Sequence, residues 1–131
     1  VLVVSDEDVA PLHAGPPALL WIVDVTDESH PVPVASYQVA EVDGSPRPPY
    51  TGCHQPCETV TGTEIPVAWF GQGLRVIDIA NPHALREVAA FVPDPAPGAT
   101  QAMSNDVCVD ERGLIYLIDR HRGLTILERT R

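Results

Sequence analysis

The residue types best suited to chemistry gather in one short segment, Gly52-Cys53-His54-Gln55-Pro56-Cys57-Glu58. Thiolate and imidazole groups suit zinc and copper. In an extended strand, however, positions 53 and 57 lie about 13 Å apart at about 3.3 Å per residue, too far to share one ion or to form a disulfide. We therefore expect no metal and no other cofactor. The alternative is a copper or zinc site in which a turn replaces the strand or other parts of the protein supply ligands.

A second polar set occurs later in the chain. Aligning the segment from Asn105 onward with the first set pairs His54 with Asn105, Gln55 with Asp106 and Cys57 with Cys108. The two matched cysteines are expected to be small, buried packing residues. The polar residues could bind a ligand or cation together, or could instead bond to a neighbouring unit and to ordered water.

A local basic spot, Arg120-His121-Arg122, stands out on an otherwise acidic chain. It falls in a predicted hairpin, where it could meet an anionic partner or could simply be a solvated turn. No serine has a nucleophile-elbow context, and no phosphate-binding loop is present. We therefore predict no catalytic residue.

The elements that must position these residues are repeated along the chain. Apolar runs begin at Leu20 (LWIVDV), at Leu74 (LRVIDI) and, more loosely, at Leu124 (LTILE). Each has a second apolar run upstream, and short glycine-bearing connections join the two later pairs, which favours antiparallel hairpins. The upstream runs are Val1 to Val4, Ile65 to Phe70 and Leu114 to Ile118. Asp24 and Asp78 end two central runs and are expected to accept backbone N–H groups in the turns.

Further strands are predicted on either side of these pairs. More polar outer strands follow at 32–38 and 86–92, and the candidate inner strands are 54–60 and 105–110. The nearly continuous apolar character of the central runs indicates strands covered on both faces. The sequence therefore predicts an all-β fold: a partial β-propeller of about two and a half blades of four-stranded antiparallel sheets. The blades are 1–40 without an inner strand, 52–94 complete, and 104–129 without an outer strand. Links at 43–50 and 93–100 connect the blades, and a loop at 6–17 joins the first two strands of blade one.

The runs beginning at Leu20 and Leu74 resemble those of LVIVD-repeat proteins, whose blades read as a glycine, the LVIVD motif and a turn with Asn-Pro or Asp-Pro. The best copy runs from Gly73 to Asn81-Pro82, and the third departs by ending in Glu128 without such a turn. The resemblance implies a ring of blades, often in bacterial secreted or surface proteins, that binds a partner. A more distant similarity is to selenium-binding and methanethiol oxidase propellers, which are metal-dependent enzymes, but none of their motifs transfers residue by residue.

In such a ring the starts of the inner strands face a central channel. We accordingly predict a non-catalytic binding or scaffold module for an unknown protein or small-molecule ligand. The alternatives are a metal-dependent, oxidoreductase-like propeller with its site in the channel near His54, and a segment that mainly closes the ring. The channel-facing binding candidates are His54, Gln55, Glu58, Asn105 and Asp106, and the rim candidates are Arg120, His121 and Arg122.

The composition of the chain disfavours some classes of binding partner. The 131 residues carry 18 acidic and 8 basic side chains, a formal net charge of −10, which disfavours nucleic acid and anionic lipid surfaces. No stretch approaches the roughly 18 apolar residues of a membrane-spanning helix, so no membrane insertion is expected. The chain starts within a predicted strand, so we expect it to be the C-terminal part of one propeller whose upstream blades are its partners. A secreted or cell-surface location would need an upstream signal peptide.

Overall fold

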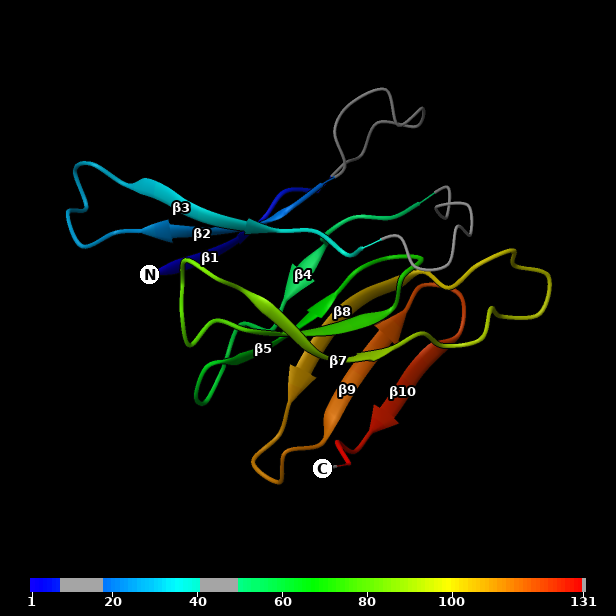
Figure 1. Ribbon diagram of the computed structural model, residues 1–131. Coiled ribbons are helices and arrows are strands. Elements are labelled where there is room, and N and C mark those ends of the chain that lie inside the picture. The colour runs from blue at the N-terminus through cyan, green and yellow to red at the C-terminus, as the bar shows by residue number, and fades with distance from the viewer. Residues whose placement is uncertain (8–17, 41–49, 131) are drawn as a thin grey trace.

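The structure is a computed structural model that describes residues 1–7, 18–40 and 50–130. These residues form ten strands in three antiparallel sheets, and no helix that could cross a membrane occurs among them (Figure 1). The strands are β1 (Leu2–Ser5), β2 (Leu20–Asp24), β3 (Val32–Tyr37), β4 (Gln55–Pro56), β5 (Glu64–Ala68), β6 (Leu74–Asp78), β7 (Arg86–Phe91), β8 (Ser104–Val109), β9 (Ile115–Asp119) and β10 (Gly123–Leu127).

Each sheet corresponds to one predicted blade. Blade one has the order β1-β2-β3, blade two β4-β5-β6-β7, and blade three β8-β9-β10. In the described part of the chain, blade one lacks an inner strand and blade three lacks an outer strand. The predicted all-β architecture of partial propeller blades is confirmed.

The blades stack face to face. Side chains alternate between the two faces of each strand, so blade two presents apolar side chains to a neighbour on each side. In blade two, Ile65, Val67 and Ile77 pack with Leu20 of blade one. On the opposite face, Leu74 and Val76 pack in a second apolar cluster with residues of blade three. The prediction of strands covered on both faces is therefore confirmed for β6. In β2 only one face is fully buried.

The inner strand of blade two is shorter than predicted. It was expected over 54–60, but β4 spans only Gln55–Pro56. Pro56 lies in β4 and Pro66 lies in the facing strand, and neither has an N–H group to donate to the ladder. The Cys57 N–H donates to Pro66 O at 2.8 Å, and the chain then leaves the sheet at a bend. β4 is nevertheless an edge strand, as the proline in it predicted.

The turns after the central strands are held as predicted. The Asp24 carboxylate accepts the Thr26 N–H at 2.9 Å, and Asp78 accepts the Ala80 N–H at 3.0 Å. These hydrogen bonds lower the pKa of both carboxyl groups, with the side chain of Thr26 the largest cause for Asp24 and Arg86 the largest for Asp78. Most of the predicted loop at 6–17 and of the link at 43–50 lies outside the described residues.

Candidate functional site

Five side chains from all three blades meet at the end of the stack where the β5–β6 and β9–β10 turns lie. We call them the loop-end cluster. Glu7 follows β1, His54 precedes β4, Phe70 follows β5, Asn105 lies in β8 and Arg120 follows β9.

Phe70 is the centre of this cluster. Its ring is buried, and its backbone has a φ of 41°, a conformation that is uncommon for a residue other than glycine. Phe70 adopts it within a tight turn, in which Gln72 N donates to Trp69 O at 2.9 Å and Gly73 N donates to Phe70 O at 3.1 Å. Phe70 also exchanges two backbone hydrogen bonds with Ser104, at 3.0 and 3.1 Å. The turn of blade two is thereby tied to the inner strand of blade three.

His54 joins the cluster from the start of β4, where its N–H donates to Ala68 O at 3.0 Å. Its imidazole stacks on the Phe70 ring, with centroids 4.4 Å apart and an interplanar angle of 17°. Its Nδ1 lies 3.3 Å from Glu7 Oε1. His54 therefore connects the backbone of blade two to a carboxylate that follows the first strand of blade one.

Arg120 completes the cluster from blade three. Its Nε donates to the Asn105 side-chain oxygen, and its guanidinium carbon lies 5.5 Å from the centroid of the Phe70 ring. At an exposed site such a cation–π contact contributes about 0.5–1 kcal/mol. Since a guanidinium carries five N–H donors, the group has capacity for further acceptors.

A buried carboxylate shapes the turn that carries Arg120. Asp119 accepts the N–H groups of Met103, His121 at 2.9 Å and Arg122 at 3.0 Å. Burial raises the pKa of this carboxyl group, but the three hydrogen bonds lower it by more, so the pKa lies below its usual value. The ionised Asp119 carboxylate thus holds the turn through hydrogen bonds to its backbone N–H groups.

The three rim candidates lie in the predicted hairpin but point to different surroundings. Arg120 contacts the loop-end cluster, whereas Arg122 Nη1 donates to Asp94 O at 3.2 Å in the link after blade two. His121 is exposed beside a hollow of about 370 Å³ that Tyr50 and Gln101 also line. They do not form one continuous basic patch.

The channel candidates also divide into two groups. His54 and Asn105 belong to the loop-end cluster, while the other three do not. Gln55 pairs with Ala68, and Asp106 pairs with Ile118, so the two occupy equivalent ladder positions, as their alignment predicted. Glu58 is exposed and lines a shallow groove of about 250 Å³ with Asp106.

Sequence reasoning missed Glu7, Phe70 and Asp119. The pair of glycines after Phe70, Gly71 and Gly73, was the one available signal that a tight turn would force that residue into an unusual conformation. Nothing in the sequence pointed to Glu7, because its partner His54 lies 47 residues further along the chain.

The cysteines form no disulfide, and all three are free. Cys53 packs between blades one and two and Cys57 between blades two and three. Burial raises the pKa of the Cys53 thiol. Cys108 was predicted to be buried, and this was wrong: it is exposed, because none of the sheets in the described part of the chain covers its side of blade three. Within the described ranges, no three His, Cys, Asp or Glu residues are placed to hold a metal ion.

Comparison with known families identifies the repeat. The family model of the LVIVD repeat matches residues 18–39 and 65–91, which include β2–β3 and β5–β7. The resemblance to LVIVD-repeat proteins is thus confirmed for the first two copies. No match was found among curated proteins or solved structures, and nothing supports the more distant similarity to selenium-binding propellers.

Proposed function

We propose that this chain, which carries LVIVD repeats on partial propeller blades, is a non-catalytic binding or scaffold module whose ligand contacts the loop-end cluster. The observation that carries the proposal is the convergence of five side chains from three separate sheets. Stacked sheets form a rigid support, and binding residues are commonly held on the loops of such scaffolds.

The chemistry of the cluster favours a small polar ligand or the polar group of a peptide. Arg120 and His54 lie against the Phe70 ring and supply hydrogen-bond donors, and Glu7 and Asn105 supply hydrogen-bond acceptors. A ligand carboxylate could pair with the guanidinium in the bidentate arrangement that arginine favours. None of these groups forms the nucleophile and base pair that covalent catalysis needs.

Titration followed by nuclear magnetic resonance tests this proposal. The probes are acetate, phosphate and a glycyl dipeptide, added separately to the isotope-labelled protein. At least one probe should shift amide signals of His54, Phe70 and Arg120, and Arg120→Ala should abolish these shifts. Arg86→Ala, at the exposed first position of β7, is the matched control and should leave them unchanged. Shifts that persist in Arg120→Ala would contradict the proposed site.

Further blades of the same propeller are the proposed structural partners. Apolar side chains are exposed on the free side of blade one, at Leu2 and Val4, and on that of blade three, at Ile118, Leu124 and Ile126. Apolar faces of this kind mark surfaces that other protein covers. A polypeptide extended by its natural upstream residues should bind less of a dye that fluoresces on apolar surfaces than residues 1–131 do. Equal binding per molecule would argue against upstream blades as the cover.

A further inference from the structure

The loop-end cluster contains one side chain of the type whose charge ordinarily changes between pH 5 and 8, which is histidine. That side chain is His54. The charged members beside it are Glu7 and Arg120, whose opposite charges cancel while the imidazole is neutral. Protonation of His54 therefore changes the cluster from neutral overall to singly positive.

A neutral His54 leaves a buried polar atom unsatisfied. Its Nδ1 has no hydrogen-bond partner among the described residues, although Glu7 Oε1 lies 3.3 Å away. A protonated imidazole carries an N–H group on both ring nitrogens, so Nδ1 can then donate to that carboxylate. Hydrogen bonds between oppositely charged groups are stronger than those between neutral groups. Protonation thus neutralises the Glu7 carboxylate, which otherwise repels an anion near Arg120.

The Phe70 ring holds His54 and Arg120 near each other. The imidazole centroid lies 4.4 Å from the centroid of this ring, and the guanidinium carbon lies 5.5 Å from it. Two positive charges at these places are within about 10 Å of each other, a distance at which surface charges still interact. An anion bound to Arg120 is therefore close enough to be attracted by a protonated His54.

The other ionisable groups around His54 are acidic. On its own segment, burial raises the pKa of the Cys53 thiol, so this neighbour stays uncharged. Asp6 precedes Glu7 and acts electrostatically on the same thiol. Glu58, further along the segment, is exposed. None of these groups is a histidine, so His54 determines how the charge of the cluster varies between pH 5 and 8.

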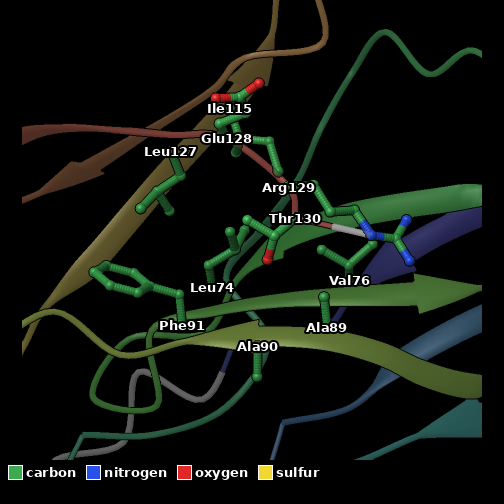
Figure 2. A pocket seen from close by; sticks show the side chains of 10 residues that line it. All are labelled: Leu74, Val76, Ala89, Ala90, Phe91, Ile115, Leu127, Glu128, Arg129 and Thr130. Atoms are coloured by element: carbon green, nitrogen blue, oxygen red, sulfur yellow. The ribbon is translucent and has the colours of Figure 1, made fainter.

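The other described histidines lie outside the cluster. His30 and His83 are in turns at the opposite end of the strands, and His121 lines the hollow described above. The groove between blades two and three is lined by apolar side chains and by three polar residues, Glu128, Arg129 and Thr130 (Figure 2). No histidine is among its described lining residues, so its charge stays constant over this pH range.

We propose that protonation of His54 increases the affinity of the loop-end cluster for an anionic ligand. The ligand is then held in mildly acidic solution and released as the pH rises. This inference rests on the proposed function and adds the regulation of the same site. By linkage, a bound anion in turn favours the protonated imidazole. The charges and their spacing correspond to an affinity change of about fivefold.

Titration with sulfate, followed by nuclear magnetic resonance, tests the proposal. Sulfate keeps its charge across this range, so the probe itself does not titrate. At constant ionic strength, the amide signals of Phe70 and Arg120 should report binding about fivefold tighter at about pH 5.5 than at about pH 8. In His54→Gln the difference should fall below about twofold. His83→Gln and Arg129→Ala, which lie outside the cluster, are the matched controls and should retain the full difference.

A second variant, Glu7→Gln, tests the other half of the pair. It removes the negative charge without protonation of His54, so sulfate should bind about threefold more tightly at about pH 8. Unchanged affinity in this variant would overturn the proposal. So would equal affinity of the unmodified protein at the two pH values, or a pH dependence lost in His121→Gln and kept in His54→Gln. Each of these outcomes leaves the binding site intact, whereas absence of sulfate binding at both pH values would overturn the proposed function as well.

Discussion

Blades two and three carry the same repeat but differ in what covers them. Leu74 is 3% exposed and its counterpart Leu124 is 57% exposed; Val76 is 3% exposed and Ile126 is 56%. All four are apolar residues at equivalent ladder positions. The neighbouring sheet, and not the strand sequence, therefore decides which apolar strand becomes core. An apolar strand without such a neighbour marks a surface to be covered.

The largest difference between the two blades is expected at their equivalent glycines. Gly73→Ala should destabilise the fold by at least about 4 kcal/mol, because the added Cβ meets the backbone of β7 and the positive φ disfavours alanine. Gly123→Ala has only the φ penalty, about 1 kcal/mol. Chemical denaturation of both variants measures the difference. Similar losses would mean that β7 does not approach Gly73 as described.

The next largest effect separates core from surface leucines. Leu74→Ala should lower the free energy of unfolding by about 3 kcal/mol, since it leaves a cavity between blades two and three. Leu124→Ala should lower it by only about 0.5 kcal/mol, because that side chain is largely in solvent. Urea unfolding monitored by tryptophan fluorescence gives both values. Equal values would show that blade three does not cover blade two.

The turns of the two blades should respond differently to acid. Asp119 lies where blade two has Trp69, and hydrogen bonds keep the pKa of its carboxyl group below the usual value. Its stabilisation is present above the unfolded-state pKa of about 4 and is lost as the pH falls through the lower folded-state value. Asp119→Asn should cost about 1 kcal/mol at pH 7 and should reduce the acid dependence of stability below about pH 4. An unchanged acid dependence of stability would be inconsistent with an ionised Asp119 carboxylate that holds this turn.

The last comparison concerns the interface between blades one and two and the interface between blades two and three. Tyr37→Phe gives the first interface the residue that Phe91 supplies at the second, and it removes the hydrogen bond to Glu87. The expected cost is about 1 kcal/mol. Phe91→Tyr, the reciprocal change, should be nearly neutral, because the Phe91 side chain is partly exposed. Melting temperatures of the two variants are sufficient for this comparison, and a larger loss for Phe91→Tyr than for Tyr37→Phe would contradict it.

Much of this architecture was predictable because burial on both faces leaves a continuous apolar run, as in Leu74 to Ile79. The register between repeats, which pairs Gln55 with Asp106, was also predictable. The exposure of Cys108 was not predictable, since burial at that position depends on a neighbouring sheet and not on its own strand. Nor was the loop-end cluster, because its contacts join residues far apart in the chain through the strained backbone of Phe70.

The reactivity of the three thiols tests the stacking of the blades most directly. Cys57 and Cys108 occupy equivalent positions, but only Cys57 is covered by a neighbouring blade. Cys53 is buried between blades one and two. In the folded 131-residue protein a thiol-specific reagent should modify Cys108 rapidly and the other two only on unfolding. Rapid modification of Cys57 in the folded protein would contradict the face-to-face arrangement of blades two and three.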